Sequence, residues 1–341
     1  MKKTILKDWK KIGVEDSPIP EIGEEQALVK LLYGGICGTD IHVYAHRHKT
    51  ATLPRVLGHE YCGEIISINT KKRYDLKVGD YVTSHPINSC GQCNSCLLGR
   101  ENVCSDLEIY GIHVDGCFAE YFMVPVSKIY KINKDVDLMA AVQIEPLAVA
   151  IHDVSLSKLE IGQTVFIISA GPIGLLIAIV AREAGASRIV LSELNEYRIA
   201  MARRLGFTVF DPSEPDFEKK LFAETGGDGF DVIYEVSGSK QGAELMTKIA
   251  AQRASIVVVG VPQEKYPIDT GAILAKELNI VGVRIHPRFD FKRAVDLVNS
   301  GTINEDLKKL VTNIFPLDNI SEAFSYSIED QTHLKVLLSA L

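Results

Sequence analysis

The sequence predicts an α/β protein with two domains, one rich in β-strands and one built on a doubly wound parallel sheet. Its 341 residues exceed what a single hydrophobic core usually organises, about 250–300 residues. The hydrophobic fraction is 46% and the charged fraction 24%, as in ordinary folded chains. From about residue 160 the pattern changes to strands that alternate with helices, which favours the parallel sheet.

The first 150 or so residues contain β-type runs separated by glycine, asparagine and aspartate. Strands are expected at 27–32, 61–68, 81–84 and 119–124. In the second part we expect strands at 165–169, 188–192, 231–236, 255–260 and 280–283, and helices at 173–184 and 196–205. A helix at 291–299 and a mixed tail follow, and this last segment can rejoin the first domain.

Charge and hydropathy exclude several classes of protein. The net charge is −7, and no basic block is present that would neutralise a run of phosphates, so a nucleic-acid partner is not expected. The N-terminus lacks the apolar core of a signal peptide. The apolar run 165–181 contains Gly171, Pro172 and Gly174, which favours a strand–turn–helix over a membrane span. We therefore expect a cytoplasmic protein.

Four of the seven cysteines fall within fifteen residues, at Cys90, Cys93, Cys96 and Cys104. Four thiolates at this spacing can close a tetrahedron around zinc, with no vacant position for chemistry. An iron–sulfur cluster, which also uses four thiolates, is the alternative. Cys62 and Cys117 have apolar or aromatic neighbours and are expected to be inert core residues.

The turn after the first strand of the second part resembles a dinucleotide-binding turn. Gly171 and Gly174 match two positions of the G-x-G-x-x-G pattern, and Pro172 suits the first helical turn. Ser169 stands at the first glycine position, where we expect it in β conformation. The helix N-terminus then offers free N–H groups to a pyrophosphate.

A carboxylate follows at the end of the second strand, nineteen residues after Gly174, at Glu193. It can accept both hydroxyls of an adenosine ribose and would repel a 2′-phosphate, so NAD is preferred over NADP. A solvated surface carboxylate is the alternative. Arg198 lies five residues later, on the next expected helix.

Two glycine-flanked turns carry metal-binding side chains, Cys37 in the first and His59 with Glu60 in the second. Three protein ligands would leave a fourth position of a zinc ion open for water or substrate. Glu145 lies in an apolar stretch, where a carboxylate needs a partner such as a metal or metal-bound water. The alternative is that the cysteine and histidine are structural.

The whole chain resembles the zinc-dependent medium-chain alcohol dehydrogenases. The matching segments are 37–42, 58–60, 90–104, 116–121, 145–148 and 168–174. Glu60 and the Ile-Glu-Pro-Leu motif around Glu145 resemble the sorbitol-type polyol and sugar-acid dehydrogenases. The segments 37–44, 116–121 and 195–198 are similar to threonine dehydrogenases.

The resemblance implies a GroES-like catalytic domain over 1–153 and 288–341 and a Rossmann domain over 154–287. It implies two zinc ions per chain, one on the four clustered cysteines and one on Cys37, His59 and Glu60, with Glu145 ligating that second zinc or holding its water. Thr39 would take the substrate proton and pass it, through the nicotinamide ribose, to His42. Members are commonly tetramers, sometimes dimers.

Further contacts are assigned on the same resemblance. Arg284 and Glu145 would contact substrate. The cofactor would contact Gly171, Pro172, Ile173, Gly174, Glu193, Arg198, Val259, Gly260, Val261, Val283 and Arg284.

We therefore expect a reversible NAD-linked oxidation of a secondary alcohol of a polyol or sugar acid (sorbitol/L-iditol, galactitol or L-galactonate/L-gulonate type) to the ketone. An L-threonine 3-dehydrogenase is the alternative, and a catalytically silent binding protein is a remote one. The loop 43–57 carries His46, Arg47, His48 and Lys49, which are either solvated or contact a substrate carboxylate.

Overall fold

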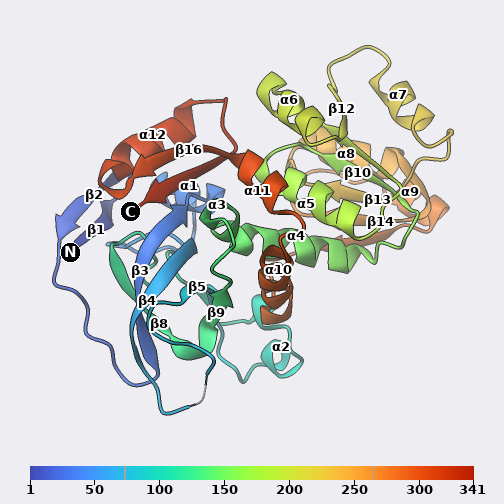
Figure 1. Ribbon diagram of the computed structural model, residues 1–341. Helices are drawn as coiled ribbons and strands as arrows, with labels where there is room; N and C mark the ends of the chain where they lie inside the picture. Colours follow the sequence, from blue (N-terminus) through green and yellow to red (C-terminus); the bar gives the residue numbers. More distant parts are fainter. Residues whose placement is uncertain (73, 263) are drawn as a thin grey trace. The chain divides into compact units, whose positions relative to one another are not determined.

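The computed structural model describes residues 1–72, 74–262 and 264–341, which divide into two compact units. Unit 1 comprises Met1–Ala148 and Pro287–Leu341, and unit 2 comprises Val149–His286 (Figure 1). The division falls inside the helix α4 (Ile144–Ser157), so that its first turn, with Glu145, belongs to unit 1.

Unit 1 is built around a mixed seven-stranded sheet, in the order β16-β17-β3-β4-β5-β9 with β8 also paired to β3. Its strands are β3 (Gln26–Gly35), β4 (Glu60–Asn69), β5 (Tyr81–Ser84), β8 (Tyr121–Pro125), β9 (Ile129–Ile132), β16 (Val311–Pro316) and β17 (Lys335–Ser339). Two hairpin-like pairs accompany it, namely β1 (Lys2–Asp8) with β2 (Lys11–Asp16) and β6 (Ile87–Asn88) with β7 (Glu108–Ile109). The helices are α1 (Gly38–Tyr44), α2 (Asn94–Leu97), α3 (Leu138–Ala141), α10 (Arg288–Ser300), α11 (Asn304–Leu310) and α12 (Ile320–Glu329).

The register of this sheet brings distant segments to one end of it. The last residue of β3, Gly35, pairs with the first residue of β4, Glu60. On the other side of β3, Leu337 of β17 pairs with Gly35 in an antiparallel register. The turn after β3, the turn before β4 and the start of β17 therefore meet.

Unit 2 holds a six-stranded parallel sheet in the order β12-β11-β10-β13-β14-β15. Its strands are β10 (Thr164–Ile168), β11 (Arg188–Ser192), β12 (Thr208–Phe210), β13 (Phe230–Glu235), β14 (Ala250–Val258) and β15 (Asn279–Gly282). Its helices are α5 (Pro172–Glu183), α6 (Glu196–Arg204), α7 (Phe217–Ala223), α8 (Lys240–Lys248) and α9 (Thr270–Lys276). By position in the chain the strand order is 3-2-1-4-5-6, that of a dinucleotide-binding doubly wound sheet. The predicted fold class is confirmed.

The predicted strands 81–84 and 188–192 coincide with β5 and β11, and most other predicted elements differ by a few residues at their ends. β14 begins at Ala250, five residues before the predicted start at 255, because its first half pairs with β13 through an irregular register. Arg253 there has a positive φ of 63°. The predicted strand 119–124 begins only at Tyr121. The β1–β2 pair and α1 were not predicted.

The apolar run 165–181 forms most of β10, a turn and the larger part of α5, as the sequence predicted. Among the described residues, no helix has both the length and the apolar character needed to cross a bilayer.

Candidate functional site

The side chains of Cys37, His59 and Glu60 converge in unit 1, with one ligand atom from each lying within 4.8 Å of the other two. Cys37 is the N-cap of α1, and Glu60 is the first residue of β4. His59 and Glu60 are buried, with 7% and 1% of their surface exposed. Among the described residues, Glu145 does not join this group, although it is close enough to influence the pKa of both His59 and Glu60.

Local sequence shapes both turns. The Cys37 sulfur accepts the Thr39 N–H at 3.4 Å, while the Asp40 carboxylate accepts the Cys37 N–H at 2.9 Å, a reciprocal cap that starts α1. Gly58 has φ +95°, and a Cβ there would lie 2.4 Å from the Phe118 ring. Only glycine fits this position.

Asp40 links the two turns and was not predicted as a site residue. It is fully buried, accepts the Gly58 N–H at 3.3 Å and lies 3.6 Å from Nδ1 of His59. Burial lowers the pKa of His59, but the Asp40 and Cys37 side chains outweigh it and hold that pKa well above its usual value. Asp40 thus places a carboxylate beside the imidazole, as is common next to metal-binding histidines. Its place three residues after Cys37 was the signal that could have shown it.

Lys335, at the start of β17, was also missed. Its ammonium donates to both carboxylate oxygens of Glu60, at 2.7 and 2.9 Å, and the two side chains are 6% and 1% exposed. Burial raises the pKa of Glu60, Lys335 opposes this, and the neighbouring Glu145 raises it further. Lys335 and Glu60 are 275 residues apart in the chain, so no local pattern connects them.

Thr39 and His42 lie three residues apart on α1, and such residues share a helix face. Both are partly buried. Burial and the positive charge of Arg47 lower the pKa of His42, so its imidazole stays neutral to lower pH than a free histidine.

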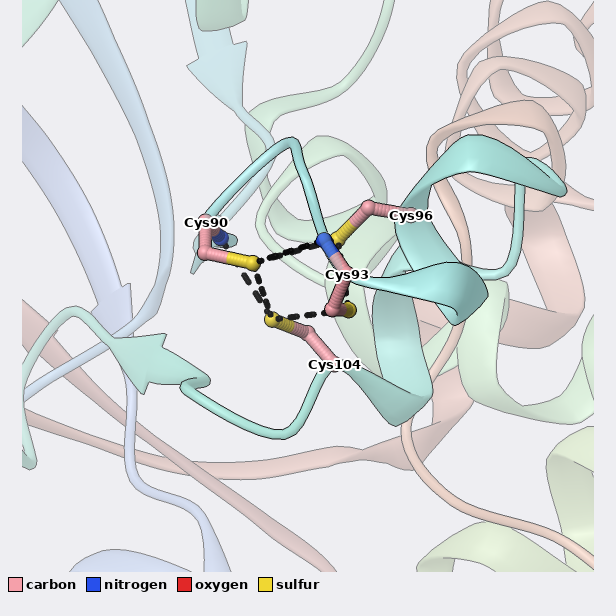
Figure 2. Close-up of side chains that lie close together, drawn as sticks. All are labelled: Cys90, Cys93, Cys96 and Cys104. Atoms are coloured by element: carbon pink, nitrogen blue, oxygen red, sulfur yellow. Dashed lines mark hydrogen bonds between the residues drawn. The ribbon is translucent and has the colours of Figure 1, made fainter.

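Cys90, Cys93, Cys96 and Cys104 point toward one centre in Figure 2. Four S···S separations are 3.5 Å for Cys93–Cys96 and Cys90–Cys104, 3.8 Å for Cys93–Cys104 and 4.0 Å for Cys90–Cys96. A tetrahedron with Zn–S bonds of about 2.3 Å has edges of about 3.8 Å. A disulfide would need about 2.05 Å, so the four sulfurs are spaced as zinc ligands.

Backbone N–H groups point at these sulfurs. The Cys93 N–H donates to Cys90 Sγ, and the Asp106 N–H donates to Cys104 Sγ, both at 3.3 Å. The backbone N–H of Ser105 contributes most to lowering the pKa of the Cys93 thiol to about 6. The backbone therefore favours the thiolate form of Cys93, the form that binds metal, whereas burial raises the pKa of Cys96 to about 11.

In unit 2, the predicted cofactor residues lie where the parallel strands end. Gly171 is the N-cap of α5 and Pro172 its first residue. A Cβ on Gly174 would lie 2.1 Å from the Ser169 carbonyl oxygen, so helix and turn pack as closely as expected. The expected β conformation of Ser169 is wrong: its φ is +94°, because the tight turn demands a glycine-like backbone.

The other predicted cofactor residues follow β14 and β15. The N–H groups of Val259 and Gly260 both donate to the Glu235 carbonyl at 2.8 Å, and Val283 donates to the Val258 carbonyl at 3.2 Å. Val261 is exposed, and Arg284 follows Val283 on the surface of unit 2. Ligands of such sheets bind outside the carboxyl ends of the strands.

Glu193 follows β11 and is 8% exposed. Its Oε1 accepts the N–H groups of Leu194 and Asn195 at 2.9 and 3.1 Å, and its Oε2 accepts that of Ala170 at 3.0 Å. The alternative of a solvated surface carboxylate is therefore wrong. Arg198 lies 4.0 Å from Oε2. Glu193 and Ser169 both line a cavity of about 620 Å³, whose apolar wall includes Phe217 and Leu245.

In the loop 43–57, His46 stacks on Trp9 with ring centroids 4.1 Å apart. Thr50 Oγ1 lies 2.9 Å from Nε2 of His113 and 3.4 Å from Nδ1 of His48. Arg47 and Lys49 are exposed. His46 and His48 thus both have partners in unit 1, whereas the side chains of Arg47 and Lys49 are exposed to solvent.

Comparison with known proteins gives two matching family models, "Alcohol dehydrogenase GroES-like domain" over residues 23–134 and "Zinc-binding dehydrogenase" over residues 172–300. The chain is 35% identical to 2-dehydro-3-deoxy-L-galactonate 5-dehydrogenase of Pseudoalteromonas atlantica, over 94% of this chain and 92% of the relative. It is 34% identical to L-threonine 3-dehydrogenase of Bacillus velezensis, over 98% of both. A structure from Sinorhizobium meliloti 1021, described as a zinc-binding dehydrogenase without a stated substrate and bound to NADP, matches at TM-score 0.92 and 35% identity, covering 99% of this chain and 98% of that one.

Proposed function

The chain belongs to the zinc-dependent medium-chain alcohol dehydrogenases, and on that premise we propose that it oxidises a secondary alcohol of a polyol or sugar acid to the ketone, reversibly, with NAD. The convergence of Cys37, which is partly buried, with the buried His59 and Glu60 is the observation that carries this proposal. A silent binding protein would not need an intact set of three converging metal ligands.

The donor set fits zinc. It offers one sulfur, one imidazole nitrogen and one carboxylate oxygen, each a common zinc ligand. Asp40 and Glu145 add negative charge around it, and Lys335 offsets only part of that charge. A zinc ion held by these residues would supply a Lewis acid that lowers the pKa of a substrate hydroxyl. Lys335 would keep Glu60 oriented, and Glu145 would hold the hydroxyl or a water.

The proton leaves along α1 in this proposal. The Thr39 hydroxyl can accept a proton and donate its own, so it can pass the proton onward from the substrate oxygen. His42, on the same face, is the terminal acceptor, and its lowered pKa keeps it neutral and ready to accept. The family uses NAD as a second cofactor besides zinc, and the nicotinamide ring of NAD, when bound, accepts the hydride.

Replacing His42 by alanine should slow oxidation by about tenfold, because water can take over the end of a relay only in part. The loss should be largest below neutral pH, and added imidazole should restore part of the rate.

Replacing Arg47 by glutamine should move the acid limb of the kcat/KM profile to higher pH, because the positive charge of Arg47 lowers the pKa of His42. Rates measured across the pH range check both; a His42→Ala profile equal to the wild type would contradict the relay.

Unit 2 is proposed to bind the dinucleotide at the carboxyl ends of its strands, with the pyrophosphate at the N-terminus of α5 and the adenosine in the 620 Å³ cavity. Glu193 is buried and held by three backbone N–H groups, so its negative charge is fixed in place. A fixed carboxylate favours a ribose with a free 2′-hydroxyl, which supports NAD over NADP.

Replacing Glu193 by serine should raise KM for NAD more than tenfold and narrow the preference over NADP, because charged hydrogen bonds contribute roughly 1.5–3 kcal/mol each. The protein should also be less stable, since the N–H groups of Ala170, Leu194 and Asn195 lose their acceptor. Glu193→Gln keeps the shape of the side chain but removes its charge, so this variant separates the effect of the lost charge from the effect of lost packing. An unchanged NAD/NADP ratio in both variants would place the selecting residue elsewhere.

The sugar-acid relative favours a polyhydroxylated acid, and the threonine dehydrogenase relative, almost as similar, supports an amino-alcohol acid as the second candidate. Both classes combine a secondary hydroxyl with a carboxylate. The exposed cations Arg47 and Lys49 of unit 1 offer partners for a carboxylate.

A substrate panel decides between these candidates. The purified protein is incubated with NAD⁺ and, separately, polyols, aldonic acids and L-threonine, while the absorbance of NADH is followed. We expect turnover of a polyol or sugar acid, above that of L-threonine and of primary alcohols. Turnover of L-threonine alone would show that the substrate is an amino-alcohol acid and not a polyol or sugar acid. If no secondary alcohol were oxidised with NAD⁺ or with NADP⁺, the proposed function would be contradicted.

We also propose that the chain forms a homo-oligomer, a tetramer or dimer. β15 is the last strand of the unit 2 sheet, and among the described residues only its β14 side is paired. Val261, Ile268 and Leu274, which lie between β14 and β15 in the chain, are 74%, 41% and 83% exposed, and a second copy would cover such apolar side chains. Light scattering coupled to size exclusion gives the mass; a monomer at micromolar concentration would contradict this.

A further inference from the structure

The hydroxyl of Ser169 lies between two groups that we propose bind the cofactor. Its Oγ donates to Oε2 of Glu193 at 3.3 Å and accepts the Gly171 N–H, also at 3.3 Å. Glu193 is the proposed ribose acceptor, and the Gly171 N–H belongs to the turn that opens α5. A single side chain therefore engages both groups.

The backbone of Ser169 is held in a conformation that side chains rarely adopt. Its φ is +94°, and its carbonyl oxygen would lie 2.1 Å from a Cβ on Gly174, so helix and turn are already in close contact. Such strain persists where surrounding interactions hold it. The two hydrogen bonds of the hydroxyl are local interactions of this kind.

The hydrogen bonds of Glu193 differ in how easily a ligand can replace them. A carboxylate offers about four lone-pair sites, and here three backbone N–H groups and the Ser169 hydroxyl approach it. The N–H groups are fixed by the backbone, whereas the hydroxyl can leave by rotation of one side-chain bond. Ser169 and Glu193 line the same 620 Å³ cavity, so a ligand there meets both.

We propose that the Ser169 hydroxyl is an internal competitor of the cofactor, which occupies the Glu193 carboxylate and the Gly171 N–H until the dinucleotide displaces it. This inference rests on the proposed function, in which unit 2 binds NAD. Only the fraction of the protein whose binding groups are free can bind the dinucleotide. The apparent dissociation constant is therefore the intrinsic one divided by that fraction. Ser169 thus weakens the binding of NAD and NADH.

The test compares Ser169→Ala with Ser169→Gly in the full-length protein, by titration with NADH and by thermal melting. Both variants lack the hydroxyl, so both should bind NADH about three- to tenfold more tightly than the wild type does. This is the range expected when one hydrogen bond that competes with the ligand is removed. Backbone strain is present with and without cofactor and therefore cancels from the dissociation constant. It does not cancel from stability: Ser169→Gly should melt roughly 2–4 °C above Ser169→Ala.

The control is Ser187→Ala, which removes an exposed hydroxyl of the same unit that is bonded to the Gly162 and Gln163 carbonyls. It should leave the NADH affinity unchanged. Weaker or unchanged binding in both Ser169 variants would overturn the proposal, because the hydroxyl would then aid the cofactor or not touch it. Tighter binding in the glycine variant alone would also overturn it, by assigning the effect to the backbone. A wild-type protein that binds neither NADH nor NADPH would contradict the proposed function itself.

Discussion

Replacing Cys37 by alanine should lower the turnover of the alcohol substrate by roughly 10³-fold or more while the chain stays folded. Lewis-acid stabilisation by a bound metal contributes several kcal/mol to a transition state, and each 1.36 kcal/mol is tenfold in rate. Cys37 offers the only sulfur of the metal-capable group with His59 and Glu60 in the described chain, and two ligands alone bind zinc poorly. The checks are kcat, zinc per chain and the melting temperature of the variant.

The matched control is Cys62→Ala. Cys62 is buried in the same unit, its thiol donates to the Leu138 carbonyl at 3.5 Å, and burial raises its pKa to about 12. This variant should keep its zinc and its turnover. If Cys37→Ala kept most of its activity, zinc at this position would not take part in the reaction.

Replacing Cys93 by alanine should instead destabilise the protein, with a melting temperature lower by about 10 °C or more. Binding energy at a closed four-thiolate site is folding energy, worth about 10–16 kcal/mol in small zinc domains, and even a partial loss exceeds typical single-residue effects. The four sulfurs of the loop 90–104 converge on one another, and its helix α2 has no buried residue. The measurements are thermal unfolding and zinc content.

Ser95→Ala, in the same loop but not in the cysteine cluster, is the control and should melt within about 2 °C of the wild type. A Cys93→Ala protein that melted normally and still held two zinc ions would contradict the structural role. Loss of activity without loss of stability would instead place chemistry at this loop.

The sequence predicted the elements whose signal is local. In unit 2, apolar strands alternate with helices, and each strand ends at a turn residue, so β10, β11 and α5 could be placed within a residue or two. The cysteine spacing indicated the four-sulfur cluster, because neighbouring thiols in one short loop need no knowledge of the tertiary fold.

Contacts made by sheet register could not be predicted. Lys335 reaches Glu60 only because β17 and β4 flank the same end of β3, and nothing in either segment indicates the other. Asp40 was overlooked because its carboxylate acts on His59 through space, although it follows Cys37 closely in the chain. The backbone of Ser169 was mispredicted, because a turn packed against Gly174 overrode the preference of serine for negative φ.

The most direct test of the account is the dependence of NADH formation on zinc at the Cys37–His59–Glu60 site. Protein dialysed against a chelator until one zinc ion per chain remains is titrated with zinc, and the initial rate with the best substrate of the panel is measured at each addition. We predict no activity at the start, a linear rise, and saturation at one added equivalent, at two zinc ions per chain. Full activity before any zinc is added back would contradict the claim that this site carries the reaction.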